Sequence, residues 1–573
     1  MKDPTEKKTV TEEESGLHNS DFYMLFFFGA ALGVLAFLIT YGTSILDLAN
    51  DKWILRNTDI DIKQHYIGLL HYLNAPWSFP LGCMDTLSYP YTMSIVWTDS
   101  IPIFCVFTKL LKGLLPTTPQ LFGWYGLLTF ALNGGFGAIL TFRVTKNRTL
   151  SLFSSFFFIF SFPVLQRLFY HTSLAAHYII SAALYYFYSD IKRSPLKRGI
   201  IYGFFGFLCV SIHSYFLPFA GVILLADTVK TYITEVPDKK NIMGLVKTGI
   251  PLLSFCIVAL FSLYFYGAFS TPVNHAGFSL GEFNANLNTF YNSLGDGRLP
   301  GLKNKYNTQY EGFGYLGLGV LIMCAVSALI LIQKSVRLIS ENKLKVFMKS
   351  HVKILLTVCM FIIFFIMAVV PEADLDEVTL IPGIFPHSIK RILGVFRSNG
   401  RFIWGDIYIL ILSSVYVLNK KAGEKVLCVI VSVCLILQVF DISPMIIKKR
   451  EYYTGTYDDF DLLGKYVPED IYDHIVMTFD NGDLKMNFAY YAALNHKTMN
   501  RFYFARDIDS VINEKLDEYK KEAVEGRPDE RTVYIFNAET MKEWEAAPLH
   551  TEKVNDDLFF GYRVPEISTS TRQ

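Results

Sequence analysis

The chain has few charged residues and carries none of the common cysteine patterns. Charged side chains make up 18% of its 573 residues, compared with about 25% in ordinary soluble proteins. Its eight cysteines include neither a CxxC pair nor a cluster with histidine, which argues against a disulfide framework and a zinc site. The formal net charge is only +1, so the bulk charge gives no reason to expect a nucleic-acid partner.

Apolar residues are abundant instead. They make up 51% of the chain, and 16% of the residues are aromatic, which suits contact with lipid and interfacial belts. A membrane-spanning helix needs about 20 apolar residues. Candidate runs occupy residues 22–43, 120–142, 149–166, 173–189, 199–216, 217–233, 248–268, 314–332, 354–371, 403–418 and 426–441. We therefore predict an α-helical polytopic membrane protein with about 11 to 13 transmembrane helices.

The first apolar run follows a polar tail of mixed charge, residues 1–20. The run is too long for the core of a signal peptide and has no small-residue cleavage site, so we expect it to remain as the first transmembrane helix. A shorter apolar stretch, residues 101–115, contains Lys109 and Lys112. We expect this stretch to be re-entrant or interfacial.

Basic residues are distributed unevenly between the loops. Twenty lie in one alternating set of loops, and eight lie in the later loops between them. Because basic loops tend to stay in the cytoplasm, we predict a cytoplasmic amino terminus and outward-facing segments 44–118, 269–313 and 372–402 of a plasma-membrane protein. One run disagrees, since Lys448, Lys449 and Arg450 follow the last helix on the outward side.

The composition changes after the last apolar run. We divide the chain into a tail (1–20), a membrane domain (21–445) and a soluble domain (446–573). In the last part, short β-like runs at 475–479 and 532–536 flank a charged helical pattern at 507–525. Gly526 and Pro528 end that helix in the expected way. We predict a small α/β domain on the outward side, which binds the acceptor, covers the cavity or only packs against it.

The first outward loop contains a helical pattern with two different faces. Its apolar face is formed by Ile62, Tyr66, Leu69 and Leu73. Its polar face is formed by Asp61, Gln64, His65 and Gly68. This spacing predicts an interfacial helix that presents a carboxylate, an amide and an imidazole to a cavity.

Asp59 and Asp61 form a D-x-D pair that has two interpretations. In an extended segment the two carboxylates point the same way and could share a divalent cation, Mg²⁺ or Mn²⁺. If a helix begins at Ile60, Asp59 becomes its N-cap and points elsewhere, which leaves Asp61 alone on the polar face.

A first membrane helix followed by a long outward loop with an acidic interfacial helix resembles the GT-C superfamily of integral-membrane glycosyltransferases. More narrowly, the chain resembles a bacterial membrane family of GT-C type over about residues 20–440. The strings that carry the resemblance are DIKQHY at 61–66, PWSFPLG at 76–82, TDSIP at 98–102, QYEGFGYLG at 309–317 and FRSNGRFIW at 396–404.

The resemblance implies a GT-C-like bundle, a polyprenyl-phosphate-linked sugar donor, an acceptor hydroxyl on the outer face and a first-loop carboxylate as general base. Asp61 fits the base, and His65 lies one turn later. Chemistry agrees, because nucleotide sugars are cytoplasmic and an outward site needs a sugar that has crossed the membrane on lipid. An inverting transfer also needs a base for the hydroxyl proton and cations for the leaving phosphate.

Other outward segments supply candidate partners, each with a structural alternative. Asp99 is a second acid, a metal ligand or a helix cap. Arg397 and Arg401 suit a lipid phosphate or act as snorkelling anchors. Candidate substrate-binding residues that are otherwise ordinary helix-start or hydrogen-bonded groups are Gln309, Tyr310, Glu311, His171, His177 and His213.

The sequence therefore favours a glycosyltransferase that acts on a cell-surface glycan, lipid or protein. A transporter or flippase for lipid-linked saccharides is the rival, although transporters tend to show inverted repeats and no repeat is found here. A catalytically inactive relative with the same fold is a third alternative.

Overall fold

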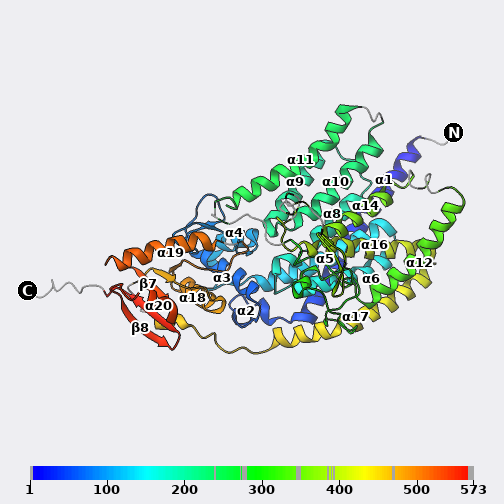
Figure 1. Cartoon of the computed structure of the whole chain (residues 1–573). Coiled ribbons are helices and arrows are strands. Elements are labelled where there is room, and N and C mark those ends of the chain that lie inside the picture. The colour runs from blue at the N-terminus through cyan, green and yellow to red at the C-terminus, as the bar shows by residue number, and fades with distance from the viewer. Residues whose placement is uncertain are drawn as a thin grey trace, which may run out of the picture.

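The computed structural model describes residues 4–237, 241–270, 273, 280–343, 347, 350–383, 386, 388, 390, 394–467, 472–506 and 508–564, with side chains from residue 20 onward except that of residue 424. A helical bundle makes up most of the molecule, and a small sheet domain built from the end of the chain lies at one end of it (Figure 1). The predicted fold class, a polytopic helical membrane protein with a C-terminal α/β domain, is confirmed.

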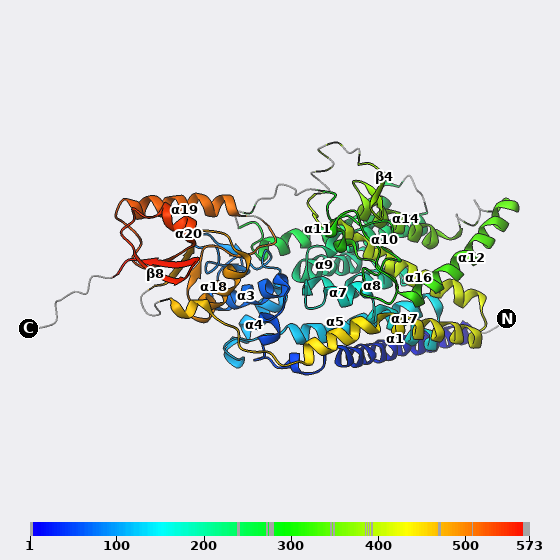
Figure 2. The same ribbon diagram turned by 60° about the horizontal axis from the view of Figure 1, so that its bottom comes forward.

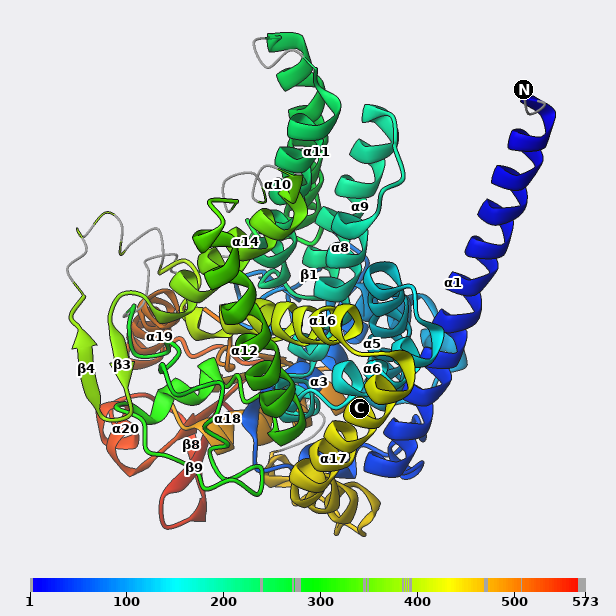
Figure 3. The same cartoon turned by 90° about the vertical axis from the view of Figure 1, so that its right-hand side faces the viewer.

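Nine helices in the described residues are long and apolar enough to cross a membrane. They correspond to parts of α1 (Pro4–Tyr41), α5 (Phe122–Thr145), α9 (Pro195–Ile212), α10 (Phe216–Glu235), α11 (Ile242–Phe265), α12 (Leu318–Ser340), α14 (Val352–Val369), α16 (Ile403–Lys421) and α17 (Glu424–Thr454). Figure 2 shows α1, α5 and α17 running along the same side of the bundle, and in Figure 3 α9, α10 and α11 stand together.

Two predicted spans are shorter than expected. Residues 149–166 form α6 (Arg148–Ile159) and α7 (Phe162–Arg167), and residues 173–189 form α8 (Tyr178–Tyr188). A helix of 12 residues such as α6 is about 18 Å long, well below the bilayer core of about 30 Å. Pro163 prevents α6 from continuing as one helix. The number of full-length spans in the described chain is therefore lower than predicted.

The basic run after the last span is used within the protein. Helix α17 extends to Thr454, and Arg450 donates hydrogen bonds to the carbonyl oxygens of Leu38 and Ile39 at 2.6 and 3.2 Å. These carbonyls lie in the last turn of α1, where cations are favourable. Lys449 is buried beside the ring of Tyr41. These contacts explain why a basic run can follow the last helix on the side predicted to face outward.

The first loop folds into compact structure. It contains α2 (Lys52–Leu55), α3 (Ile60–Asn74), the strands β1 (Cys83–Met84) and β2 (Met93–Ser94), and α4 (Pro102–Leu110). Helix α3 differs from the predicted interfacial helix, because its residues from Ile62 to Leu73 are buried on both faces except Lys63. Large exposed apolar side chains lie on α4 instead, at Phe107 and Leu110. The interfacial position of the stretch 101–115 remains a prediction, with which these exposed side chains agree.

The C-terminal domain is a mixed five-stranded sheet with three helices. The strand order is β6-β5-β7-β9-β8, with β5 parallel to β6 and β7. The strands are β5 (His474–Met477), β6 (Thr498–Met499), β7 (Thr532–Phe536), β8 (His550–Asn555) and β9 (Leu558–Tyr562), and the helices are α18 (Gly482–Leu494), α19 (Asp509–Val524) and α20 (Ala538–Glu543). The two strands and the helix predicted from the sequence in this region are confirmed.

This domain packs directly on the first loop, which buries α3. Helix α18 lies against α3 (Figure 1), where His71 Nε2 contacts the Ala489 carbonyl oxygen at 2.9 Å. The hydroxyls of Tyr66 and Tyr490 both donate to Asp51 Oδ2 at 2.8 Å. The apolar stripe that would have faced lipid is therefore covered by protein.

Two further segments that the sequence predicts to face outward complete this end of the bundle. Residues 280–317 contain a 3₁₀ helix, η4 (Asn307–Gly312), and a hairpin of β3 (Ala373–Leu375) and β4 (Val378–Ile381) precedes η5 (Asn399–Phe402). Helices η4 and η5 are in contact, so the strings at 309–317 and 396–404 that were noted in the sequence lie together at this end of the bundle.

Candidate functional site

A chain of alternating carboxylates and imidazoles lies at the end of the bundle that carries the C-terminal domain. His171 Nδ1 is 3.0 Å from Asp61 Oδ2, and His171 Nε2 is 3.3 Å from Asp99 Oδ2. Asp99 Oδ1 is in turn 3.4 Å from His213 Nε2. The Asp61 side chain is 26% exposed, whereas those of the other three are 11% exposed or less. Asp61 is thus the member of the chain that solvent or a substrate can reach.

Helix α3 positions Asp61 through the N-cap at its start and a glycine, Gly68, on its polar face. Asp59 Oδ1 accepts a hydrogen bond from the Asp61 backbone N–H at 2.8 Å, so Asp59 is the N-cap. This confirms the cap alternative. Two turns further on, a side chain at Gly68 would overlap Thr98 and Ser100. Glycine therefore lets the loop that carries Asp99 approach the polar face of α3.

The loop around Asp99 has an unusual backbone. Asp99 has φ of 53° and Ile101 has φ of 59°, both in the left-handed region. A β-branched residue is rarely found there, and such a conformation costs on the order of 1–3 kcal/mol. Phe169, two residues before His171, also has a positive φ of 65°. Strained positions of this kind cluster at functional sites, and here they flank Asp99 and His171.

The carboxylates hold one imidazole in its charged form. Burial disfavours the imidazolium of His171, but its hydrogen bonds to Asp61 and Asp99 outweigh burial and raise its pKa to about 9. Burial would likewise raise the pKa of both aspartates, and the contact with His171 lowers it instead. Burial lowers the pKa of His213. At neutral pH the centre therefore contains two carboxylates and one imidazolium.

His65 adds the features of a metal site. Neither of its buried ring nitrogens has a hydrogen-bond partner in the described structure, and burial lowers its pKa to about 3. Ligand atoms of His65, Asp99 and His171 lie within 4.8 Å of one another. Two imidazoles and a carboxylate suit Mn²⁺ or Zn²⁺ better than Mg²⁺. The donor set thus fits a metal through His65 and Asp99, not through the expected pair of Asp59 and Asp61.

A second charged cluster adjoins the first. Glu311 Oε2 is 2.8 Å from both Arg167 Nη2 and Arg401 Nε, and all three side chains are 8% exposed or less. Burial would raise the pKa of Glu311, but the two guanidiniums lower it. The positive charge of Arg167 also acts on Asp61. Glu311 and Arg401, two separate candidates in the sequence, thus lie together, and Arg167 completes the cluster.

The C-terminal domain supplies residues that no sequence pattern singled out. The Ala505 N–H donates to the Trp97 carbonyl oxygen at 2.8 Å, and Arg506 donates to the carbonyl oxygen of Val395. Tyr503 lies within electrostatic reach of Asp61 and Asp99, and burial together with these carboxylates raises its pKa to about 12. The segment 500–506 therefore covers the candidate site on the side of the C-terminal domain.

Arg397 and Arg401 have different surroundings. Arg401 is turned to Glu311, and the Arg397 guanidinium lies 5.1 Å from the ring centroid of Phe283. Arg397 is within electrostatic reach of Arg506, whose pKa is lowered by burial and by that neighbouring charge. Arg397 and Arg506, one from each domain, are thus two neighbouring basic residues near the site.

Some predicted residues take other positions. Gln309 donates through Nε2 to Asn284 and Asp374 at 2.8 and 2.9 Å, so its amide holds the loops together. His177 contacts the Tyr408 hydroxyl at 2.6 Å within the bundle. Gln64 and Tyr310 stay at the edge of the site, where Gln64 Nε2 is 3.4 Å from the Trp97 carbonyl oxygen and the half-exposed Tyr310 ring lies 5.6 Å from the Arg167 guanidinium.

No curated protein matches the chain. A crystal structure of an oligosaccharyltransferase from Archaeoglobus fulgidus in its apo form is similar over 90% of this chain and 70% of that chain, with 12% sequence identity and a TM-score of 0.45. A sequence identity and a TM-score this low do not indicate an activity for this chain. A model of a DUF6311 C-terminal domain matches residues 467–563. The family model described as "Domain of unknown function (DUF6311)" matches residues 30–443, and the chain therefore belongs to the DUF6311 family.

Proposed function

We propose that the protein is a membrane glycosyltransferase that moves a sugar from a polyprenyl-phosphate donor to a cell-surface hydroxyl. The observation that carries the proposal is the partly exposed Asp61 carboxylate, which is held by His171 at one end of the bundle. His171 also contacts Asp99, and buried arginines lie nearby. Such a site suits an acceptor of protons next to groups that stabilise negative charge. The loop charges predict that this end faces outward at the plasma membrane, with the amino terminus inside.

The outward location determines the class of donor. Activated nucleotide sugars are made in the cytoplasm, so a site on the outer side requires a sugar that has been carried across the membrane on lipid. A polyprenyl phosphate remains anchored in the bilayer and presents its phosphate at headgroup level. The acceptor is a hydroxyl of a glycan, lipid or protein at the cell surface.

Asp61 acts as the general base in this proposal. Its free oxygen accepts the proton of the acceptor hydroxyl while that oxygen attacks the anomeric carbon. The bond between the anomeric carbon and the phosphate oxygen breaks, the electron pair leaves with the lipid phosphate, and the configuration inverts. His171 is a positioning residue, because its hydrogen bond fixes the other Asp61 oxygen. The lowered pKa keeps Asp61 ionised at neutral pH, so it is ready to accept the proton as the transfer proceeds.

In this proposal the leaving phosphate is bound by basic residues between the two domains. Arg397 and Arg506 lie at the junction of the two domains, and guanidiniums bind phosphate oxygens well. Arg167 and Arg401 form ion pairs with Glu311 and add positive electrostatic potential to the site. A metal held by His65, Asp99 and His171 would supply further charge for the leaving group. Metal binding would require His171 to lose its proton.

The proposal is tested by Asp61→Asn with Asp59→Asn as the matched control. Both changes remove one carboxylate charge from the same turn. Asparagine is as good an N-cap as aspartate, so Asp59→Asn should retain transfer, whereas loss of a general base should lower the rate about 10²–10⁴-fold. Sugar transfer from a lipid-linked donor is measured in proteoliposomes after equal folding has been checked by gel filtration.

Equal transfer by both variants would remove Asp61 as the base. If neither the wild type nor a variant transfers sugar and lipid-linked saccharide crosses the bilayer instead, the transporter alternative replaces the enzyme. Absence of both activities would support an inactive relative of the same fold.

A further inference from the structure

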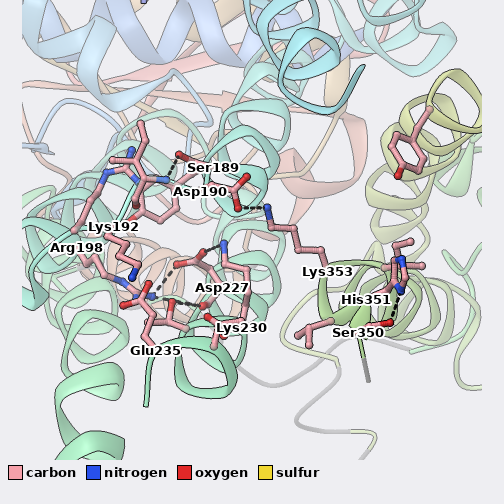
Figure 4. Close-up of a pocket in the computed structure, with 18 residues that line it drawn as sticks. Ser189, Asp190, Lys192, Arg198, Asp227, Lys230, Glu235, Ser350, His351 and Lys353 are labelled. Atoms are coloured by element: carbon pink, nitrogen blue, oxygen red, sulfur yellow. Dashed lines mark hydrogen bonds and ion pairs between the residues drawn. The ribbon is translucent and has the colours of Figure 1, made fainter. Parts of the chain in front are cut away.

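A second polar cavity lies at the opposite end of the bundle from Asp61. It has a volume of about 510 Å³, and the ends of α8 and α10 and the beginnings of α9 and α14 surround it. Figure 4 shows Arg198 and Lys230 directed toward Asp227 on one wall and Lys353 facing Asp190 on another. The basic loops gather at this end, which the loop charges predict to be cytoplasmic. None of the proposed transfer chemistry uses this cavity.

The inner wall has an unbalanced buried charge. Asp227 Oδ2 is 2.8 Å from Arg198 Nη2, and Asp227 Oδ1 is 2.5 Å from Lys230 Nζ. The Tyr202 hydroxyl donates to the same carboxylate at 2.7 Å. All three charged residues are more than nine-tenths buried, and Arg198 Nε has no partner in the described structure. Two cations face one carboxylate, so one positive charge remains to be compensated, which is costly in a buried site.

The rim adds more positive charge. Lys192 and Arg193 lie at the mouth, and Arg193 covers the ring of Tyr186 at 4.8 Å. Lys353 pairs with Asp190, and Glu235 is exposed at the edge. The charged residues that line the cavity are Lys192, Arg193, Arg198, Lys230, Lys353, Asp190, Asp227 and Glu235, so cations outnumber carboxylates both inside and at the rim.

An apolar groove begins beside this cavity. It has a volume of about 890 Å³ and runs between α9 and α11 from Pro195 to Phe265. Arg198 lines the polar cavity, and its neighbour Gly199 lines the groove. Gly203 continues the groove one turn later. Along α9, therefore, the residues that line the basic pocket are followed directly by residues that line an apolar groove.

We propose that this pocket binds the phosphate group of an anionic lipid, whose acyl chain lies in the groove between α9 and α11. Basic pockets between transmembrane helices on the cytoplasmic side are suited to anionic headgroups. A phosphate would compensate the extra buried charge at Arg198 and Lys230 and would meet Lys192 and Arg193 at the rim. Free phosphate has the same headgroup chemistry but makes no use of the groove.

The test compares lipid binding by three proteins in detergent. The pocket variant is Lys192→Ala with Arg193→Ala, and the matched control is Lys247→Ala with Lys334→Ala, which removes two exposed basic residues at the same end outside the cavity. Native mass spectrometry measures the affinity for phosphatidylglycerol and phosphatidylcholine. Removing two cations near a phosphate should weaken phosphatidylglycerol binding about 30-fold, while the control stays close to the wild type.

Two further measurements separate the sources of the phosphate. A Gly203→Phe variant fills the groove and should weaken lipid binding without changing the thermal stabilisation by inorganic phosphate. If inorganic phosphate binds in a pocket-dependent way and lipid shows no preference, the phosphate site stands with a soluble source. Equal phosphatidylglycerol affinity in the pocket and control variants, with no stabilisation by phosphate, would overturn the proposal. None of these readouts depends on sugar transfer.

Discussion

The buried Glu311 cluster gives a prediction whose size follows from the structure. Glu311→Gln leaves Arg167 and Arg401 buried without their shared counter-ion. At 2.8 Å, each ion pair has a Coulomb energy of about 6 kcal/mol with an effective dielectric constant of about 20. Desolvation offsets much of this attraction, and breaking a buried pair costs about 3–5 kcal/mol in practice. We expect a loss of unfolding free energy in this range.

The matched control is Glu372→Gln. Glu372 pairs with Lys305 at the same distance of 2.8 Å, but both side chains are more than one-fifth exposed. A pair that water can reach contributes about 0–1 kcal/mol. The assay is reversible unfolding in mixed detergent micelles, followed by tryptophan fluorescence. Equal destabilisation by the two substitutions would refute the claim that burial makes the ion pairs of Glu311 contribute more to the free energy of unfolding than an exposed pair does.

Three further predictions concern the proposed site. The pKa of His171 is raised from 6.5 to about 9. The ion pairs of its imidazolium therefore stabilise the fold fully below about pH 6.5 and are lost as the pH rises through 9. Sugar transfer and thermal stability should fall together in that range, and flat profiles of both between pH 7 and 10 would contradict this. His65→Ala should abolish binding of Mn²⁺ or Zn²⁺ in calorimetry, and unchanged affinity would remove His65 as a ligand. Arg506→Ala should raise the KM for donor about tenfold, whereas Arg531→Ala, at an exposed ion pair in the same domain, should leave it unchanged; equal KM values would exclude Arg506 from the phosphate site.

The sequence predicts the elements of this fold better than their burial. Long apolar runs reveal most spans, because a bilayer requires length and low charge. The amphipathic spacing of α3 correctly groups Asp61, His65 and Gly68 on one face. The same pattern cannot reveal that α18 covers the opposite face, since that contact joins segments more than four hundred residues apart.

For the candidate site, too, the sequence predicts individual residues but not the contacts between them. Asp61, Asp99, His171 and His213 are predicted separately as candidates, but only the folded chain makes His171 the link between the two aspartates. Periodicity carries no information about Tyr503 and Arg506, because their segment is irregular. The sequence likewise does not reveal that Arg401 forms an ion pair with Glu311 while Arg397 lies against Phe283.

The most direct test of the account is a mass-spectrometric comparison of surface glycans from cells with and without the protein. The account predicts that one sugar modification disappears when the protein is removed. Wild-type protein and Asp59→Asn should restore this modification, and Asp61→Asn should not. Identical glycans in all four strains, with the protein present and folded, would contradict the claim that Asp61 is the base of a glycosyl transfer.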